Sequence, residues 1–143
     1  MIGGLTVLDA QSSATLADII RRESRSLLSY MADAYPWASA KKEPALETLR
    51  QTVHASSTAV TTLGKYLVKQ RATPPVLGSY PTYFTSCNFV GLEWLLPRLV
   101  ASEKESLATL EADAHKVHNE GAKEQLAVLA AVKRKNLAAL ESL

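Results

Sequence analysis

Apolar residues recur with a helical period along almost the whole chain, and no stretch shows the apolar–polar alternation of a half-buried β-strand. The period stops at the stretches YPW, ATPPVLGSYP and HNEG, which contain the residues that end helices. We therefore expect an all-α fold, with one domain over residues 1–143 and a kink at Pro97. The pattern predicts four helices, over residues 13–34, 43–71, 82–117 and 121–142.

The connections between these helices differ in length. Short connections follow the first and third helices, which predicts two antiparallel helical hairpins. The connection ATPPVLGSYP, residues 72–81, contains two adjacent prolines, and an extended chain of this length spans roughly 30 Å. A helix of about 20 residues has the same length. We therefore expect a four-helix bundle in which Thr73 to Pro81 cross its full length, so that helices two and three run parallel.

This arrangement resembles the ferritin-like superfamily, and the resemblance covers residues from about Ser12 to Leu143. It rests on helix lengths, the long crossover, and Glu23 and Glu103 on the apolar stripes of the first and third helices. In members of that superfamily that bind two metal ions, the first and third helices each supply one Glu ligand. The second and fourth helices each supply a Glu-x-x-His. Here the second helix offers Gln51 to His54, and the fourth has Lys133 on its stripe and no such motif. The resemblance thus implies a fold with ferritin-like topology rather than an enzyme.

Two glutamates that interrupt apolar stripes have three explanations. In the first, Glu23 and Glu103 lie at the edge of the stripe and their carboxylates reach water. In the second they form a salt-bridged polar layer, and in the third they bind a metal. A buried unpaired carboxylate is costly, so a layer needs a cation, and the stripe arithmetic places Lys133 at a comparable height. The predicted polar core layer is therefore Glu23, Glu103 and Lys133. Three arginines are further candidates to lean in: Arg22, Arg98 and Arg134.

The stretch EADAHKVHNEGAKE holds two of the three histidines. His115 and His118 are neighbours on a helix surface, and together with His54 they resemble the histidine triad of DinB-like four-helix proteins. The spacing here is one residue shorter than the His-x-x-x-His of those proteins. The other interpretation is a helix end, with Asn119 and Gly121 supplying left-handed backbone geometry.

Aromatic residues flank the breaks at both Tyr-Pro pairs. In the crossover topology these breaks belong to the same end of the bundle, so their aromatic side chains are expected to gather. The gathering is either a hydrophobic lid on the core or a ligand pocket or partner surface. The residues are Tyr35, Trp37, Tyr80, Tyr83, Phe84 and Trp94.

Composition and motifs restrict the function classes. The formal charge is +2 and the basic residues are dispersed among acids, so we expect no nucleic-acid partner. No window approaches the roughly 20 apolar residues of a membrane span, and the N-terminus has no basic n-region, so we expect no membrane partner. Cys87 is the only cysteine, which together with these features predicts a cytoplasmic location.

The sequence therefore predicts a non-catalytic, ferritin-like binding or interaction protein with an unknown small-molecule ligand, no cofactor and no bound metal. Alanines in excess of one core stripe on the fourth helix predict a homodimer: Ala127, Ala130, Ala131, Ala138 and Ala139. The alternative is a metal-binding four-helix protein with oxidoreductase or hydrolase activity. Its site would be a degenerate di-iron carboxylate site at Glu23 and Glu103, or the histidine site.

Overall fold

The computed structural model describes residues 8–143, so residues 1–7 of the expected domain lie outside the described part. The described residues form α-helices and two short 3-10 helices, and they contain no β-strand. The expected all-α class is confirmed for this part of the chain. The α-helices are α1 Ala10–Ser24, α2 Leu27–Tyr30, α3 Glu43–Lys69, α4 Leu92–Ala114 and α5 Glu120–Glu141, and the 3-10 helices are η1 Ala40–Lys42 and η2 Thr82–Cys87.

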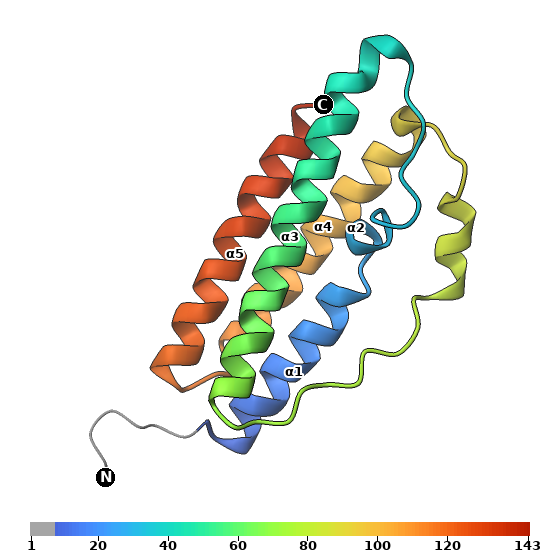
Figure 1. Cartoon of the computed structure of the whole chain (residues 1–143). Coiled ribbons are helices and arrows are strands. Elements are labelled where there is room, and N and C mark those ends of the chain that lie inside the picture. Colours follow the sequence, from blue (N-terminus) through green and yellow to red (C-terminus); the bar gives the residue numbers. More distant parts are fainter. Residues whose placement is uncertain (1–7) are drawn as a thin grey trace.

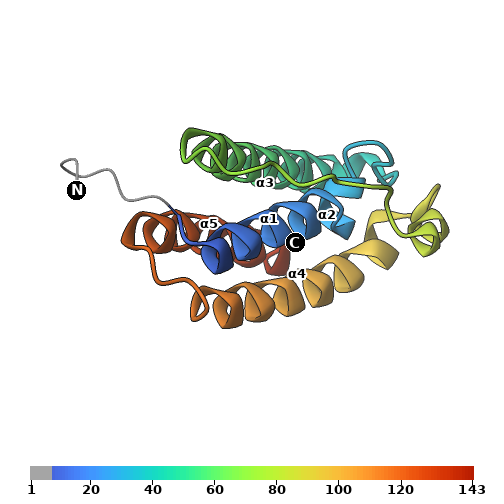
Figure 2. The same ribbon diagram turned by 90° about the horizontal axis from the view of Figure 1, so that it is seen from below.

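The four long helices lie side by side (Figure 1). Helices α3 and α4 run in the same direction, and α1 and α5 run in the opposite direction. After α3 the chain returns along the helices to the start of α4, beside α1 and α3 (Figure 2). Arg25 holds this crossover, because its Nε donates to the Gly78 carbonyl at 2.7 Å and its guanidinium lies over the Tyr80 ring. The proline-rich connection thus has the path that its length predicts.

The first predicted helix, 13–34, is wrong in its extent. Helix α1 ends at Ser24, and after a break the four-residue helix α2 begins at Leu27. Ser26 caps α2 by accepting from the Ser29 amide at 3.1 Å, and the Ser29 hydroxyl donates to the Glu23 carbonyl at 2.7 Å. Serine side chains compete well with backbone hydrogen bonds at such positions. The break preserves the apolar stripe and is therefore invisible to hydrophobic periodicity.

The third predicted helix, 82–117, is also wrong in its extent. Its first residues form η2, and α4 begins only at Leu92. In between, Phe89 has a φ of 59°, which interrupts a right-handed helix. The Trp37 amide donates to the Val90 carbonyl at 3.1 Å, and the Leu92 amide donates to the Trp37 carbonyl at 3.0 Å. Pro97, expected to kink a longer helix, lies in the second turn of α4.

The connection between α4 and α5 differs from the expected left-handed helix end. Asn119 has a φ of −78° and caps α5, since its side chain accepts from the Ala122 amide at 3.0 Å. Gly121 lies in the first turn of α5 and does not have a positive φ. Its lack of a side chain accommodates Tyr66, whose hydroxyl oxygen would be 2.7 Å from an added Cβ. Gly121 therefore allows the Tyr66 side chain to approach α5 closely, and it does not end a helix.

The core is divided into two apolar clusters. One includes Leu16 and Ile19 of α1, Leu63 of α3 and Leu126 of α5. The other lies toward the opposite end of the helices and includes Leu28, Leu49 and Leu99, among others. Burying such side chains stabilises the fold by about 1.5–3 kcal/mol each relative to leaving them exposed. Among the described helices, none is long and apolar enough to cross a membrane.

Candidate functional site: a buried polar layer

Buried polar side chains lie between the two apolar clusters. Along their helices, Glu23 of α1, Ser56 of α3, Glu103 of α4 and Lys133 of α5 each lie between residues of one cluster and residues of the other. Each long helix thus contributes at least one buried polar side chain between the clusters, and we call this set of residues the polar layer. The buried members are Glu23, Thr52, Ser56, Glu103, Lys133 and Asn136.

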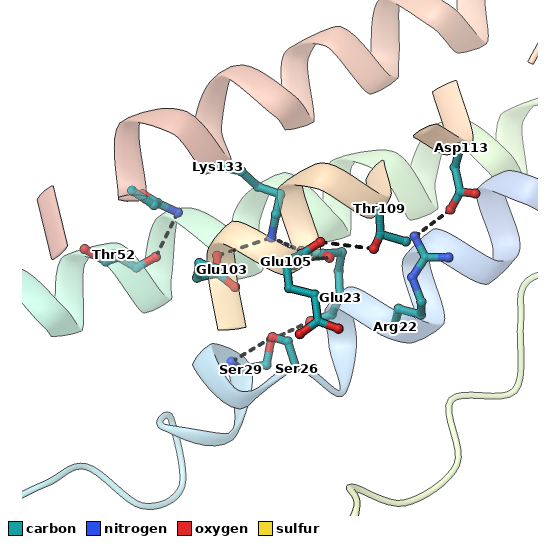
Figure 3. Close-up of polar contacts among 12 residues, drawn as sticks. Arg22, Glu23, Ser26, Ser29, Thr52, Glu103, Glu105, Thr109, Asp113 and Lys133 are labelled. Carbon is teal, nitrogen blue, oxygen red and sulfur yellow. Dashed lines mark hydrogen bonds and ion pairs between the residues drawn. The ribbon is translucent and has the colours of Figure 1, made fainter. Parts of the chain in front are cut away.

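Lys133 is the centre of this layer. Its Nζ donates to Glu23 Oε1 at 2.5 Å and to Glu103 Oε1 at 3.2 Å (Figure 3). The side chains of all three residues are at most 3% exposed. The structure thus brings together the three residues of the predicted polar layer, and neither carboxylate reaches water at the edge of its stripe. Glu23 lies one residue before the end of α1 rather than near mid-helix.

Glu23 is fully satisfied, whereas Glu103 is not. The Ser106 hydroxyl donates to Glu23 Oε2 at 2.5 Å, so both oxygens of that carboxylate accept hydrogen bonds. The other oxygen of Glu103, Oε2, is buried and has no hydrogen-bond partner among the described residues. Burial raises the pKa of Glu103, and the charge of Lys133 opposes this rise.

The three arginines considered as partners of the glutamates lie elsewhere. Arg22 forms ion pairs with Asp18 and Asp113, both at 2.7 Å. The Arg98 guanidinium lies 3.5 Å from the centroid of the Trp94 ring. Arg134 faces Glu111 across 3.5 Å. Lys133 is therefore the cation of the layer.

A second polar contact near the end of α4 was not predicted. Asp113 pairs with Arg22 of α1 at 2.7 Å and with Lys116 at 3.1 Å. Burial acts to raise the pKa of Asp113, but the ion pairs with Lys116 and Arg22 lower it overall. This carboxylate stays ionised and joins α4 to α1. Asp113 follows Leu110 by three residues, so its place on the buried face of α4 was visible in the helical spacing.

The residues of the layer do not fit a two-metal centre. The facing oxygens of Glu23 and Glu103 are both directed at an ammonium group, which occupies the position where a cation would bind them. A metal ion there would lack further ligands, because the described residues contain no group of three or more His, Cys, Asp or Glu side chains placed to hold one. The carboxylates are held by the chain's own cation.

The histidines do not form a metal site either. His54 is exposed on α3, and His115 and His118 are exposed after the end of α4. Among the described residues, no cluster of potential ligands includes them. His118 contributes its backbone amide, which donates to the Ser12 hydroxyl at 3.4 Å. The stretch therefore connects two helices and secures the start of α1.

The six predicted aromatic residues do not form one pocket. Tyr80, Tyr83 and Phe84 pack together, and Tyr30, which was not predicted, joins them at 5.2 Å from Tyr80 between ring centroids. Trp37 and Trp94 instead line a separate cavity of about 360 Å³. Tyr35 lies beneath Arg50. Trp37 forms a backbone bridge to Gly91, directly before α4.

Sequence reasoning also missed the smaller members of the layer, which are Thr52, Ser56 and Asn136, and the half-buried Ser106 beside them. Ser106 follows Glu103 by three residues, and Asn136 follows Lys133 by three, so both lie on the same helix face as the charge beside them. The Asn136 side-chain amide donates to the Thr52 carbonyl at 3.4 Å. The spacing signal was present for both, but neither residue interrupts a stripe as plainly as a charge does.

Chemically, the layer is closed. Its charged groups are buried and directed at one another, so it has no exposed nucleophile or base with which to act on a substrate. Its effect is to fix the relative heights of α1, α4 and α5, because a slip of one helix would separate a buried charge from its partner.

No protein-family model, curated protein or solved structure matches this chain.

Proposed function

We propose that this chain is a non-catalytic binding module, built on a four-helix bundle of ferritin-like topology. The topology is supported by the shared direction of α3 and α4 and by the crossover that returns along the helices between them. The interior of such a bundle is where metal centres are built from facing side chains. In this chain that interior is filled by an ion-paired layer.

A single observation carries the proposal: Lys133 donates to both buried carboxylates, at 2.5 and 3.2 Å. A lysine ammonium supplies the positive charge that a metal ion would supply, and it has no redox or Lewis-acid chemistry. The interior therefore stabilises one arrangement of helices, and binding takes place on the surface. The proposal includes a cytoplasmic location and a homodimer.

Metal analysis tests the proposal against the metalloprotein alternative. The purified protein is incubated with iron(II), manganese(II) or zinc(II), desalted, and its metal content is measured per chain. We expect far less than one equivalent of each metal. One equivalent or more that is lost in both Glu23→Gln and Glu103→Gln would overturn the proposal in favour of a carboxylate metal centre.

Lys133→Glu is a matched positive control for this assay. It replaces the cation by a third carboxylate beside Glu23 and Glu103, which creates the ligand set that the natural chain lacks. We expect this variant to be strongly destabilised without metal and to gain thermal stability when manganese(II) is added. The natural chain should show no such gain, since Lys133 already donates to both carboxylates.

A further inference from the structure

A groove with a volume of about 580 Å³ lies between α1 and α3. Ile20 of α1 and Val60 and Val68 of α3 give it apolar walls, and Pro74 of the crossover lies at its edge. Figure 2 shows the crossover running beside these two helices. The groove follows α3 from Val60 to Lys69, which is about 13 Å at the rise of an α-helix. Its volume falls in the usual range of small-molecule sites, roughly 300–1,000 Å³.

Gly64 forms part of the groove and has no structural explanation within the chain. It lies in the interior of the 27-residue α3, where glycine destabilises a helix relative to alanine. An added Cβ would meet nothing within 4 Å, so no neighbouring segment requires the missing side chain. This differs from Gly121, which accommodates Tyr66. The missing side chain of Gly64 deepens the groove.

The charge of the groove has one sign. Lys65 and Lys69 line it, and none of its lining residues in the described part of the chain is acidic. The two lysines are four residues apart on α3, so their ammonium groups are neighbours that repel each other. Neither forms an ion pair with any described residue, in contrast to Lys104, Lys116 and Lys123. An anion bound between them would remove the repulsion.

We propose that this groove binds a free fatty acid of medium chain length. The carboxylate lies between Lys65 and Lys69, and the alkyl chain extends over Gly64 between Ile20 and Val60. Apolar walls bury the methylene groups, and each buried methylene contributes to affinity. The two lysines supply charge complementarity for a single negative headgroup. The inference names a ligand class for the binding module and rests on the proposed function.

The test is titration calorimetry with dodecanoate below its micellar concentration, on the full chain. We expect saturable binding of one dodecanoate per chain. Butyrate has the same headgroup without the tail, and dodecyltrimethylammonium has the same tail with a positive headgroup. We expect both to bind at least about tenfold more weakly than dodecanoate, because a tenfold change needs only about 1.4 kcal/mol of lost interaction.

Two variants locate the site. Gly64→Leu places a side chain in the groove, its Cβ would meet nothing within 4 Å, and leucine favours the helix, so the fold should be retained. Lys65→Gln combined with Lys69→Gln removes the two charges. We expect each variant to weaken dodecanoate binding about tenfold or more. Lys41→Gln combined with Lys42→Gln is the matched control, since it removes two lysines near the opposite end of α3, and it should leave binding unchanged.

Several outcomes would overturn the inference. They are absence of dodecanoate binding, equal binding of the cationic amphiphile, or equal weakening by the control pair of lysine substitutions. Binding to anionic vesicles without binding of monomeric dodecanoate would assign the lysines to a membrane surface instead. If circular dichroism shows that Gly64→Leu does not fold, the Lys65 and Lys69 pair decides the result. Failure here leaves the metal content unchanged, so it is distinguishable from failure of the proposed function.

Discussion

At the scale of single residues, Lys133 can be removed without changing the size of the core greatly. In Lys133→Met, Glu23 and Glu103 lose the ammonium that both now accept from. Breaking a buried ion pair from one side typically costs about 3–5 kcal/mol, because a charge stays buried without a partner. We expect the free energy of unfolding in urea to fall by that amount.

The double variant Lys133→Met with Glu103→Gln separates charge from packing. It removes one of the two carboxylates that the single variant leaves unpaired, so it should be more stable than Lys133→Met alone. An unchanged urea midpoint in Lys133→Met, or no recovery in the double variant, would mean that the pairing of these charges contributes little to stability.

Glu103 should make stability depend on pH. Its pKa in the folded protein is raised from the ordinary value of 4.5 by burial, although Lys133 opposes the shift. The folded protein therefore holds this proton more tightly than the unfolded chain does. The resulting stabilisation is fully present below pH 4.5 and is lost as pH rises through the raised pKa.

Glu103→Gln tests this dependence, because the amide cannot ionise. Between pH 4.5 and neutrality we expect its free energy of unfolding to fall less with rising pH than that of the natural chain. Urea unfolding at a series of pH values measures the difference. Glu105→Gln, at an exposed position two residues away, is the control and should follow the natural chain. Identical curves for the two variants would contradict the prediction.

At the scale of elements, the sequence predicts which helices exist better than where they end. The apolar stripes located α3 and α5 closely, and Glu23, Glu103 and Lys133 met because each lies on a stripe. The ends of α1 and α4 depend on other forces. A serine cap breaks the first helix after Ser24. Backbone contacts between Trp37 and the start of α4 join segments that are distant in sequence, and α4 begins later than the apolar stripe predicts. Periodicity carries no information about either.

The cap of α5 gives a prediction at this scale. Asn119 accepts from the Ala122 amide at 3.0 Å and satisfies a donor that the first turn leaves free. Asn119→Ala should reduce the free energy of unfolding by about 0.5–2 kcal/mol, as is typical for loss of a cap. Asn119→Asp retains the acceptor and should stay close to the natural chain. Equal losses in the two variants would show that another property of asparagine matters.

At the scale of the whole molecule, the long crossover is what distinguishes this arrangement from a simple up-and-down path. Its length and prolines are read directly from the sequence, and its course beside α1 and α3 follows from them (Figure 1). The groove beside it could not be predicted in the same way. Its shape depends on Ile20, Val60 and Pro74 coming together from three segments.

The outer face of α5 gives the last prediction, which concerns assembly. Of the alanines that suggested a homodimer, Ala130 packs into the core, whereas Ala127, Ala131 and Ala138 are exposed. Val128 beside them is 56% exposed. Small side chains let a second helix approach closely, and an exposed valine gains from being covered. We expect the natural chain to sediment as a dimer at high concentration.

Ala131→Glu places a charge in the centre of this face, so the dimer should dissociate at concentrations where the natural chain stays associated. The matched control is Ala112→Glu, at an exposed position on α4. It adds the same charge to a different helix and should leave the sedimentation coefficient unchanged. A natural chain that sediments as a monomer throughout the concentration range would remove the dimer. Dissociation by both substitutions would place the contact elsewhere than on α5.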